Sequence, residues 1–210
     1  MWQLNKRTKQ PVAQEGMCRS KLLAEEVSYQ IKEAYKTART NILFAIQKKE
    51  GCHTIVLTSA IPGEGKTTTT LNTAIAFAMT GVKVLVIDAD LRKPKVHQYA
   101  NIKNETGLAN YLGGFCKLEE CIAHSKEWGL DCIPSGAIPP NPAELLSSPL
   151  LQEGLDSLKQ KYDFIFIDTP PVNMVTDGII VSKLADEVLM VVRQKYTANE
   201  ALKKALSTLQ

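Results

Sequence analysis

The sequence predicts a single α/β domain in which helices cover both faces of a doubly wound, mostly parallel sheet. The length of 210 residues suits one domain of this kind. Short runs rich in β-branched residues are apolar throughout, as in strands buried on both faces, and segments with helical periodicity separate these runs. Ligands of doubly wound domains bind at the carboxyl ends of the strands, so the functional residues are expected there.

The first predicted element is a helix that follows a polar amino-terminal stretch. Residues 1–20 show no sustained period and are expected to form a flexible arm, whereas residues 21–210 are expected to form the domain. From about Leu23 to about Gln47, apolar residues recur at steps of three and four, which places them on one stripe of a helix. The stripe consists of Val27, Ile31, Tyr35, Ala38, Ile42 and Ile46.

The rest of the chain alternates strands with helices. Strands are expected at residues 54–59, 83–88, 130–134, 164–168 and 187–192, and further helices at residues 67–79, 143–162 and from 199 onward. Four prolines between Pro134 and Ser148 indicate a stiff loop at the rim of the sheet.

The composition argues against several classes of protein. The hydrophobic share of 44% and the charged share of 22% are those of an ordinary globular domain, and a net charge of +3 gives no support for a nucleic-acid partner. The longest apolar runs are far shorter than the roughly 20 residues of a membrane-spanning helix, and no secretory signal is visible. The five cysteines form no C-x-x-C pair and are expected to be reduced thiols, and the three histidines lack zinc-site spacing. We therefore expect a cytoplasmic protein.

A phosphate-binding loop is the clearest motif of the sequence. The stretch SAIPGEGKTTTT, from Ser59 to Thr70, matches the pattern G-x-x-x-x-G-K-[ST] except that Ala60 stands at the first glycine. The loop follows a predicted strand and precedes a predicted helix, whose positive end would add to the backbone N–H groups that bind phosphate. Ala60 is tolerable because the residues that approach phosphate most closely come later in the loop.

The spacing of the loop gives its residues separate roles. Lys66 would reach the β- and γ-phosphates of ATP, and the Thr67 hydroxyl would bind Mg²⁺. The expected nucleotide-binding residues are Pro62, Gly63, Glu64, Gly65, Lys66, Thr67, Thr68 and Arg92.

Three aspartates follow two other predicted strands. Asp88 and Asp90 stand in VLVIDADLRKP, and Asp168 stands in FIFIDTPP. A carboxylate in such a buried setting costs free energy unless a cation or a hydrogen-bond donor compensates it. Mg²⁺ would be the compensating cation here.

The motifs SAIPGEGKTT, VLVIDADLRKP and FIFIDTPP together resemble those of bacterial protein-tyrosine kinases of capsule and exopolysaccharide systems, over about residues 25–200. Kinases of this family use Walker A, Walker A′ and Walker B motifs on a P-loop fold. The resemblance implies ATP-dependent phosphorylation of tyrosine, often in the tail of a neighbouring copy. It also implies that Asp168 supports the metal through water and that Asp88 and Asp90 lie at the reacting centre. The expected catalytic residues are Lys66, Asp88, Asp90 and Asp168, and the expected metal ligands are Thr67, Asp88 and Asp168.

Elementary chemistry constrains the roles of the two aspartates in VLVIDADLRKP. Phosphoryl transfer needs positioning and charge stabilisation, and a tyrosine hydroxyl with a pKa of about 10 benefits from a nearby carboxylate that accepts its proton. We expect Asp88 to be this base and Asp90 to be a metal ligand or a helper. Arg92 either touches the γ-phosphate or remains solvated.

The family joins its subunits into a ring through an E-x-x-R-x-x-R element. The matching stretch here is EAYKTAR, which contains Glu33, Lys36 and Arg39. On a helix these residues lie on the flank away from the apolar stripe, so we expect them to face another subunit rather than to form only a ladder of surface ion pairs. Lys36 replaces an arginine and lacks the planar fork that grips a carboxylate with two bonds, which weakens the expected contact.

The resemblance also implies a partner. It implies activation by the cytoplasmic tail of a membrane-embedded polysaccharide co-polymerase, which would recruit the kinase to the inner face of the plasma membrane. In the family, a further strand and a tyrosine-rich tail follow the last helix. The six tyrosines of this sequence are dispersed, so either such a tail lies beyond Gln210 or the acceptor tyrosines lie elsewhere.

Two other functions are considered. A partitioning or cell-division ATPase of the ParA or MinD type shares the predicted fold but carries a signature lysine five residues before the loop lysine, where this chain has Ile61. A non-catalytic ATP-binding regulatory subunit would not need the complete set of phosphoryl-transfer residues. Both comparisons favour a kinase.

Overall fold

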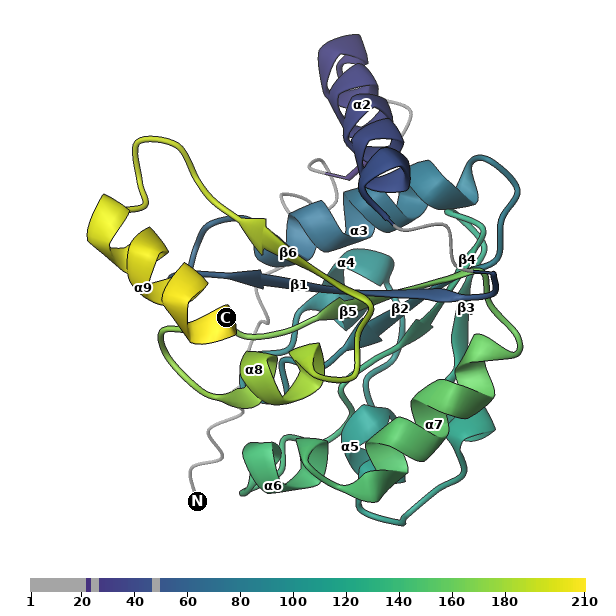
Figure 1. Ribbon diagram of the computed structural model, residues 1–210. Coiled ribbons are helices and arrows are strands. Elements are labelled where there is room, and N and C mark those ends of the chain that lie inside the picture. The colour runs from purple at the N-terminus through teal and green to yellow at the C-terminus, as the bar shows by residue number, and fades with distance from the viewer. Residues whose placement is uncertain (1–21, 24–26, 47–49) are drawn as a thin grey trace, which may run out of the picture.

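The structure of the protein, a computed structural model, describes residues 22–23, 27–46 and 50–210, so the arm expected at residues 1–20 lies outside the described residues. Its sheet has six strands in the order β3-β4-β2-β5-β1-β6 (Figure 1). The strands are β1 (His53–Ser59), β2 (Val84–Asp88), β3 (Ala123–Ser125), β4 (Leu130–Ile133), β5 (Phe164–Asp168) and β6 (Glu187–Val191). Neighbouring strands are parallel except β3 and β4, which are antiparallel. The prediction of a mostly parallel sheet is therefore confirmed.

The sequence did not predict β3. This strand has 3 residues, of which only Ser125 is buried, so it is too short for a period of two to be visible. It adds an antiparallel edge to the parallel sheet. The other five strands lie within one residue of their predicted limits.

Helices follow most strands, as predicted, but one predicted helix is divided. The α-helices are α2 (Tyr29–Ala45), α3 (Lys66–Ala78), α4 (Val96–Ala100), α5 (Leu108–Leu112), α6 (Pro142–Leu146), α7 (Pro149–Lys159), α8 (Asp177–Ser182) and α9 (Asn199–Leu209), and η1 (Leu118–Cys121) is a 3₁₀-helix. The helix expected over residues 143–162 is interrupted because Pro149 has no N–H to donate and starts a new helix at its first position. The Ser148 hydroxyl caps that helix by accepting a hydrogen bond from the Leu150 N–H at 3.2 Å.

Helices cover both faces of the sheet (Figure 1). Successive residues of a strand point to opposite faces, and in β2 the side chains of Leu85 and Ile87 join one apolar cluster whereas Val84 and Val86 join another. The first cluster contains buried residues of α5, α6, α7 and α8, and the second contains buried residues of α3 and α4. The domain is therefore doubly wound, as the sequence predicted.

The register of the sheet brings the predicted site residues to one edge. The Cα of Asp168, the last residue of β5, pairs with Leu57 of β1 on one side and with Asp88 of β2 on the other. The chain turns from β1 into the phosphate loop only two residues after Leu57. The phosphate loop and both strand-end aspartates thus meet at the carboxyl edge of the three central strands.

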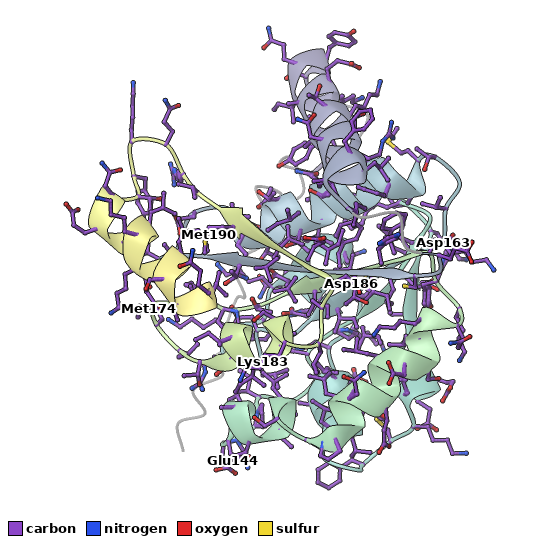
Figure 2. All side chains as sticks on the ribbon, viewed as in Figure 1. Glu144, Asp163, Met174, Lys183, Asp186 and Met190 are labelled. Carbon is purple, nitrogen blue, oxygen red and sulfur yellow. The ribbon has the colours of Figure 1, made fainter. Side chains whose placement is uncertain are left out.

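Two carboxylates close the opposite, amino-terminal edge of the sheet. Asp163 precedes β5, and its Oδ2 accepts a hydrogen bond from the Lys83 N–H at 2.7 Å. Asp186 precedes β6, and its Oδ2 accepts one from the Thr54 N–H at 2.9 Å. Figure 2 shows Asp186 before β6, whereas Met190 lies near the far end of that strand. These bonds fix the sheet at the end away from the phosphate loop.

The helix α2 is attached to the domain mainly through α3. None of its residues is buried, although Ile42 and Ile46 of the predicted apolar stripe pack against the core. Val27, at the other end of the stripe, is also buried, whereas Ile31 is 45% exposed, so the stripe is covered at its two ends and open at Ile31. The helix begins at Tyr29, later than the predicted start near Leu23, and residues 24–26 and the predicted end at Gln47 lie outside the described residues. Within the described part of the chain, no helix has both the length and the apolar character needed to cross a membrane.

Candidate active site

The phosphate loop has the backbone conformation that anion binding requires. Gly63 and Gly65 have φ values of +85° and +89°, in the left-handed region that favours glycine. α3 begins at Lys66, so the free N–H groups and the positive end of its dipole lie beside the loop. Ala60 is fully buried, and among the described residues only Asn101 and Lys195 combine a side chain with a positive φ. Position 60 therefore does not need glycine in this structure.

A cavity of about 690 Å³ lies at the carboxyl edge of the sheet, over the phosphate loop. Its size is within the usual range for small-molecule and cofactor sites. All eight residues predicted to bind nucleotide line it: Pro62, Gly63, Glu64, Gly65, Lys66, Thr67, Thr68 and Arg92. Asp90 also lines the cavity, but Asp88 and Asp168 are not among the lining residues.

Lys66 and Asp168 form the centre of the site. The Lys66 ammonium lies 2.8 Å from Oδ1 of Asp168 and 3.8 Å from Oδ2 of Asp90. The hydroxyls of Thr70 and Thr67 donate to Oδ1 and Oδ2 of Asp168, at 3.1 and 2.6 Å. Asp168 is fully buried, and these three donors compensate its charge.

Asp88 is held by the backbone of the segment that follows it. Its Oδ1 accepts a hydrogen bond from the Asp90 N–H at 3.2 Å, and its Oδ2 accepts from the N–H groups of Lys95 and Val96, both at 3.0 Å. Its side chain is fully buried, whereas Asp90 lies at the cavity wall. The assignment of the base to Asp88 therefore stays a prediction, and the geometry gives Asp90 the direct access to the cavity.

The environment of Asp88 changes its acidity. The pKa of Asp88 is raised from 3.8 to about 7, first by burial and second by the nearby Asp168 carboxylate. The Val96 N–H and the Lys66 ammonium oppose this shift because both stabilise the ionised form. A carboxyl of this kind changes its charge near neutral pH.

Arg92 has a partner that the sequence did not reveal. Its Nε and Nη2 donate to Oδ2 and Oδ1 of Asp177, at 2.8 and 3.0 Å, in a two-bond fork. The Asp177 side chain is 0% exposed and that of Arg92 is 39% exposed. The fork leaves Nη1 and the second N–H of Nη2 for the predicted γ-phosphate contact. An aspartate at the start of α8 resembles an ordinary helix-start residue, so no local pattern could have identified this pair.

The loop between β6 and α9 contacts the phosphate loop from a distant part of the chain. The Tyr196 hydroxyl donates to the Pro62 carbonyl oxygen at 3.1 Å, and Nη1 of Arg193 donates to the Gly63 carbonyl oxygen at 3.3 Å. The Arg193 guanidinium also lies over the Tyr196 ring, 4.9 Å from its centroid. A Cβ on Gly63 would lie 2.9 Å from the Tyr196 hydroxyl oxygen, so a larger residue there would displace the end of the Tyr196 side chain.

Glu64 completes the contact between the two loops. Its Oε1 accepts a hydrogen bond from the Thr197 hydroxyl, and its Oε2 accepts one from the Ile61 N–H at 2.7 Å. Lys195 has a φ of +61°, an uncommon conformation for a residue with a side chain, at the turn that brings Tyr196 to the loop. These partners are not visible in the sequence because they lie about 130 residues from the loop.

The residues present fit a magnesium ion. The Thr67 hydroxyl and the Asp168 carboxylate offer adjacent oxygen atoms, the ligand type that Mg²⁺ prefers. Mg²⁺ usually binds through one or two carboxylates together with substrate phosphates and water. This suits a site in which, over the described ranges, no group of three or more His, Cys, Asp or Glu side chains could hold a metal alone. Asp88, the third predicted ligand, has both carboxylate oxygens bonded to backbone N–H groups.

The three residues predicted at a subunit interface do not behave alike. Lys36 and Glu33 form an ion pair at 2.7 Å, and their side chains are 50% and 40% exposed. Arg39 instead donates from Nη1 to the Ala76 carbonyl oxygen of α3, at 2.6 Å. Arg39 thus ties α2 to its own domain, and its place at a subunit interface stays a prediction.

The fold and the site define a P-loop nucleotide-binding domain with strand-end aspartates. Residues 52–210 match the family model of the AAA domain. The chain is 44% identical over 177 residues to the tyrosine-protein kinase YwqD of Bacillus subtilis (strain 168), and the match covers 84% of this chain and 74% of that protein. The chain therefore belongs to the family of bacterial tyrosine-protein kinases.

Solved structures agree with this assignment. The chimerical protein CapA2B2 superposes with a TM-score of 0.82 at 37% identity, covering 88% of this chain and 81% of that one. The kinase domain of the Escherichia coli tyrosine kinase ETK gives a TM-score of 0.82 at 34% identity, covering 85% and 69%. The chain spans only 24% of the whole tyrosine-protein kinase etk of Escherichia coli (strain K12).

The cell-division ATPases share the fold to a smaller extent. The septum site-determining protein MinD from Pyrococcus horikoshii, complexed with Mg-ADP, gives a TM-score of 0.59 at 30% identity and covers 67% of this chain. The kinases match more of the chain with a higher TM-score. Ile61 stands where those ATPases carry their signature lysine, and this difference also favours the kinases over the ATPases.

Proposed function

We propose that this protein is a Mg-ATP-dependent tyrosine kinase that transfers the γ-phosphoryl group of ATP to a tyrosine hydroxyl. The single observation that carries the proposal is the position of the Lys66 ammonium, 2.8 Å from Asp168 and 3.8 Å from Asp90 beneath a phosphate loop. A chain of the tyrosine-kinase family that retains this arrangement has the charges that phosphoryl transfer needs.

The residues of the site have separate roles in the proposed phosphoryl transfer. The loop N–H groups and Lys66 bind the phosphates and offset the charge that develops on them. The phenolic oxygen of the acceptor bonds to the γ-phosphorus, the bond from that phosphorus to the β–γ bridging oxygen breaks, and ADP leaves. The phenolic proton passes to a carboxylate, for which Asp90 has the access. When bound, Mg²⁺ supplies further neutralisation of the phosphate oxygens.

We further propose that the kinase phosphorylates tyrosines of neighbouring copies within a ring-like homo-oligomer and thereby regulates capsular or exopolysaccharide biosynthesis. Its activator would be the cytoplasmic tail of a membrane-embedded polysaccharide co-polymerase, which would bring it to the inner face of the plasma membrane. Supporting this, relatives include CapB of Staphylococcus aureus, EpsB of Ralstonia solanacearum and a kinase named for the cps region of Klebsiella pneumoniae.

The activity is tested with the chain fused to such a tail and incubated with γ-labelled ATP and Mg²⁺. We expect label in phosphotyrosine with the parent and a loss of at least about 100-fold in Lys66→Met, since a charge at the transferred phosphate is removed. Equal labelling of both proteins would refute the role of Lys66.

The oligomer is tested separately through the exposed pair on α2. The double variant Glu33→Ala/Lys36→Ala removes the proposed intersubunit charges and is expected to lower the mass measured by light scattering. Arg39→Ala is the comparison variant. Unlike the double variant, it breaks the bond to the Ala76 carbonyl and is expected to loosen α2 from its own domain. An unchanged mass in the double variant would refute the interface.

A further inference from the structure

The mouth of the cavity carries exposed cationic side chains without acidic partners. Lys93, Lys95 and Arg193 line the cavity and are exposed. The ammonium groups of Lys93 and Lys95 make no hydrogen bond or ion pair within the described residues, and the Arg193 guanidinium contacts only a carbonyl oxygen and an aromatic ring. These charges are therefore available to an incoming molecule.

The other charges at the cavity are already compensated. Lys66 is paired with Asp168, and Arg92 is paired with Asp177. The lining carboxylates are buried, with Glu64 5% exposed and Asp90 8% exposed. The accessible mouth of the cavity is consequently positive.

Lys93 and Lys95 stand at a defined end of the cavity. A phosphate-loop lysine reaches the β- and γ-phosphates, so the γ end lies where Lys66 approaches Asp90. The segment that carries both lysines begins at Asp90, whereas Arg193 contacts the loop at Gly63, before the lysine. The acceptor hydroxyl must approach the γ-phosphorus in line with the leaving oxygen, and therefore from the end that Lys93 and Lys95 flank.

The backbone of these lysines is fixed by the aspartates of the site. The Lys93 N–H donates to Oδ1 of Asp90 at 3.0 Å, and the Lys95 N–H donates to Oδ2 of Asp88 at 3.0 Å. These bonds fix the backbone of both residues next to the aspartates, and both residues line the cavity. Two lysines on a surface loop elsewhere would lack these backbone bonds to the aspartates of the site.

We propose, building on the proposed kinase activity, that Lys93 and Lys95 form an acceptor subsite that selects tyrosines flanked by Asp or Glu. Complementary charge raises the rate of encounter and lowers the cost of bringing the acceptor to the mouth, and like charge does the opposite. The preference weakens with salt because both lysines are exposed to solvent.

The test uses the full chain with its activator tail and three peptides with a single tyrosine, flanked by Glu, Gln or Lys. With the parent at saturating Mg-ATP, kcat/KM is expected to fall from the Glu to the Gln to the Lys peptide by about three- to tenfold per step. In Lys93→Glu/Lys95→Glu the order reverses, and the KM for ATP changes by less than about twofold. Lys103→Glu/Lys126→Glu, with the same charge change on exposed lysines outside the cavity lining, keeps the parental order.

Three results would overturn the subsite. Equal kcat/KM for the three peptides, or an order that survives the charge reversal, would show that the lysines do not select the acceptor. A raised KM for ATP with an unchanged peptide order would assign them to the nucleotide instead. Each of these leaves the kinase activity intact, whereas absence of phosphotyrosine on every peptide with the parent would reject the proposed function together with the subsite.

Discussion

The Lys66 ammonium lies 2.8 Å from the Asp168 carboxylate, and the two side chains, 8% and 1% exposed, are separated by 102 residues in the sequence. This buried pair joins the phosphate loop to the end of β5. Each of the two buried charges is compensated by the other, so the removal of one alone leaves the other without its ionic partner.

Removing Lys66 alone should destabilise the protein. In Lys66→Met the buried Asp168 carboxylate keeps only two hydroxyl donors, and we expect the free energy of unfolding to fall by about 3–5 kcal/mol in urea titrations without nucleotide. Lys66→Met/Asp168→Asn removes both charges and should lose less than the single variant. A Lys66→Met protein as stable as the parent would contradict this account.

Stability should depend on pH through Asp88. Its pKa is about 7 in the folded protein and near 3.8 in the unfolded chain, so the folded state holds this proton more tightly. The resulting stabilisation is fully present below about pH 4 and is lost as the pH rises through about 7. As the pH rises from about 4 to about 7, the free energy of unfolding of the parent should therefore fall relative to that of Asp88→Asn. Parallel pH curves for the two proteins would show that the pKa is not raised.

The pair of Arg92 and Asp177 should respond unequally to its two truncations. Arg92→Met leaves a fully buried carboxylate without its fork and should cost on the order of 3 kcal/mol. Asp177→Ala leaves only a partly exposed guanidinium, which water can solvate, and should cost clearly less. Urea titrations of both variants give the comparison, and an equal or reversed order would contradict it.

The contact between the β6–α9 loop and the phosphate loop should support ATP affinity. Tyr196→Phe removes the hydrogen bond to the Pro62 carbonyl, worth about 1 kcal/mol, and should raise the KM for ATP by up to about fivefold with little change in kcat. Thr197→Val leaves Oε1 of the buried Glu64 without its donor and should have a larger effect. Tyr29→Phe, on the exposed start of α2, is the control. Unchanged KM values in both loop variants would remove the role assigned to the loop.

Much of the fold followed from local patterns. Buried parallel strands are apolar throughout and therefore visible, so five strands and the helix after the phosphate loop lie close to their predicted limits. The division at Pro149 was missed because the apolar period continues across it, although proline and serine are the usual signs of a helix start. β3 was too short to show a period.

The candidate site was predictable only where its residues are adjacent in sequence or end neighbouring strands. The phosphate loop carries its own spacing, and Asp88 and Asp168 are brought together by the order of the parallel strands. Asp177 and Tyr196 could not be identified, because their contacts depend on how distant loops pack over the sheet. For the same reason, the bond from Arg39 to α3 could not be seen from the helical spacing of α2.

The fate of the γ-phosphate tests the central claim most directly. The chain fused to the tail of its activator is incubated with γ-labelled ATP, Mg²⁺ and an acceptor tyrosine, and the label is divided between phosphotyrosine and free phosphate, with Asp90→Asn as the comparison. A tyrosine kinase places label in phosphotyrosine, and Asp90→Asn lowers that share while Mg-ATP still binds. Label found only in free phosphate would show an ATPase switch and contradict the proposed function.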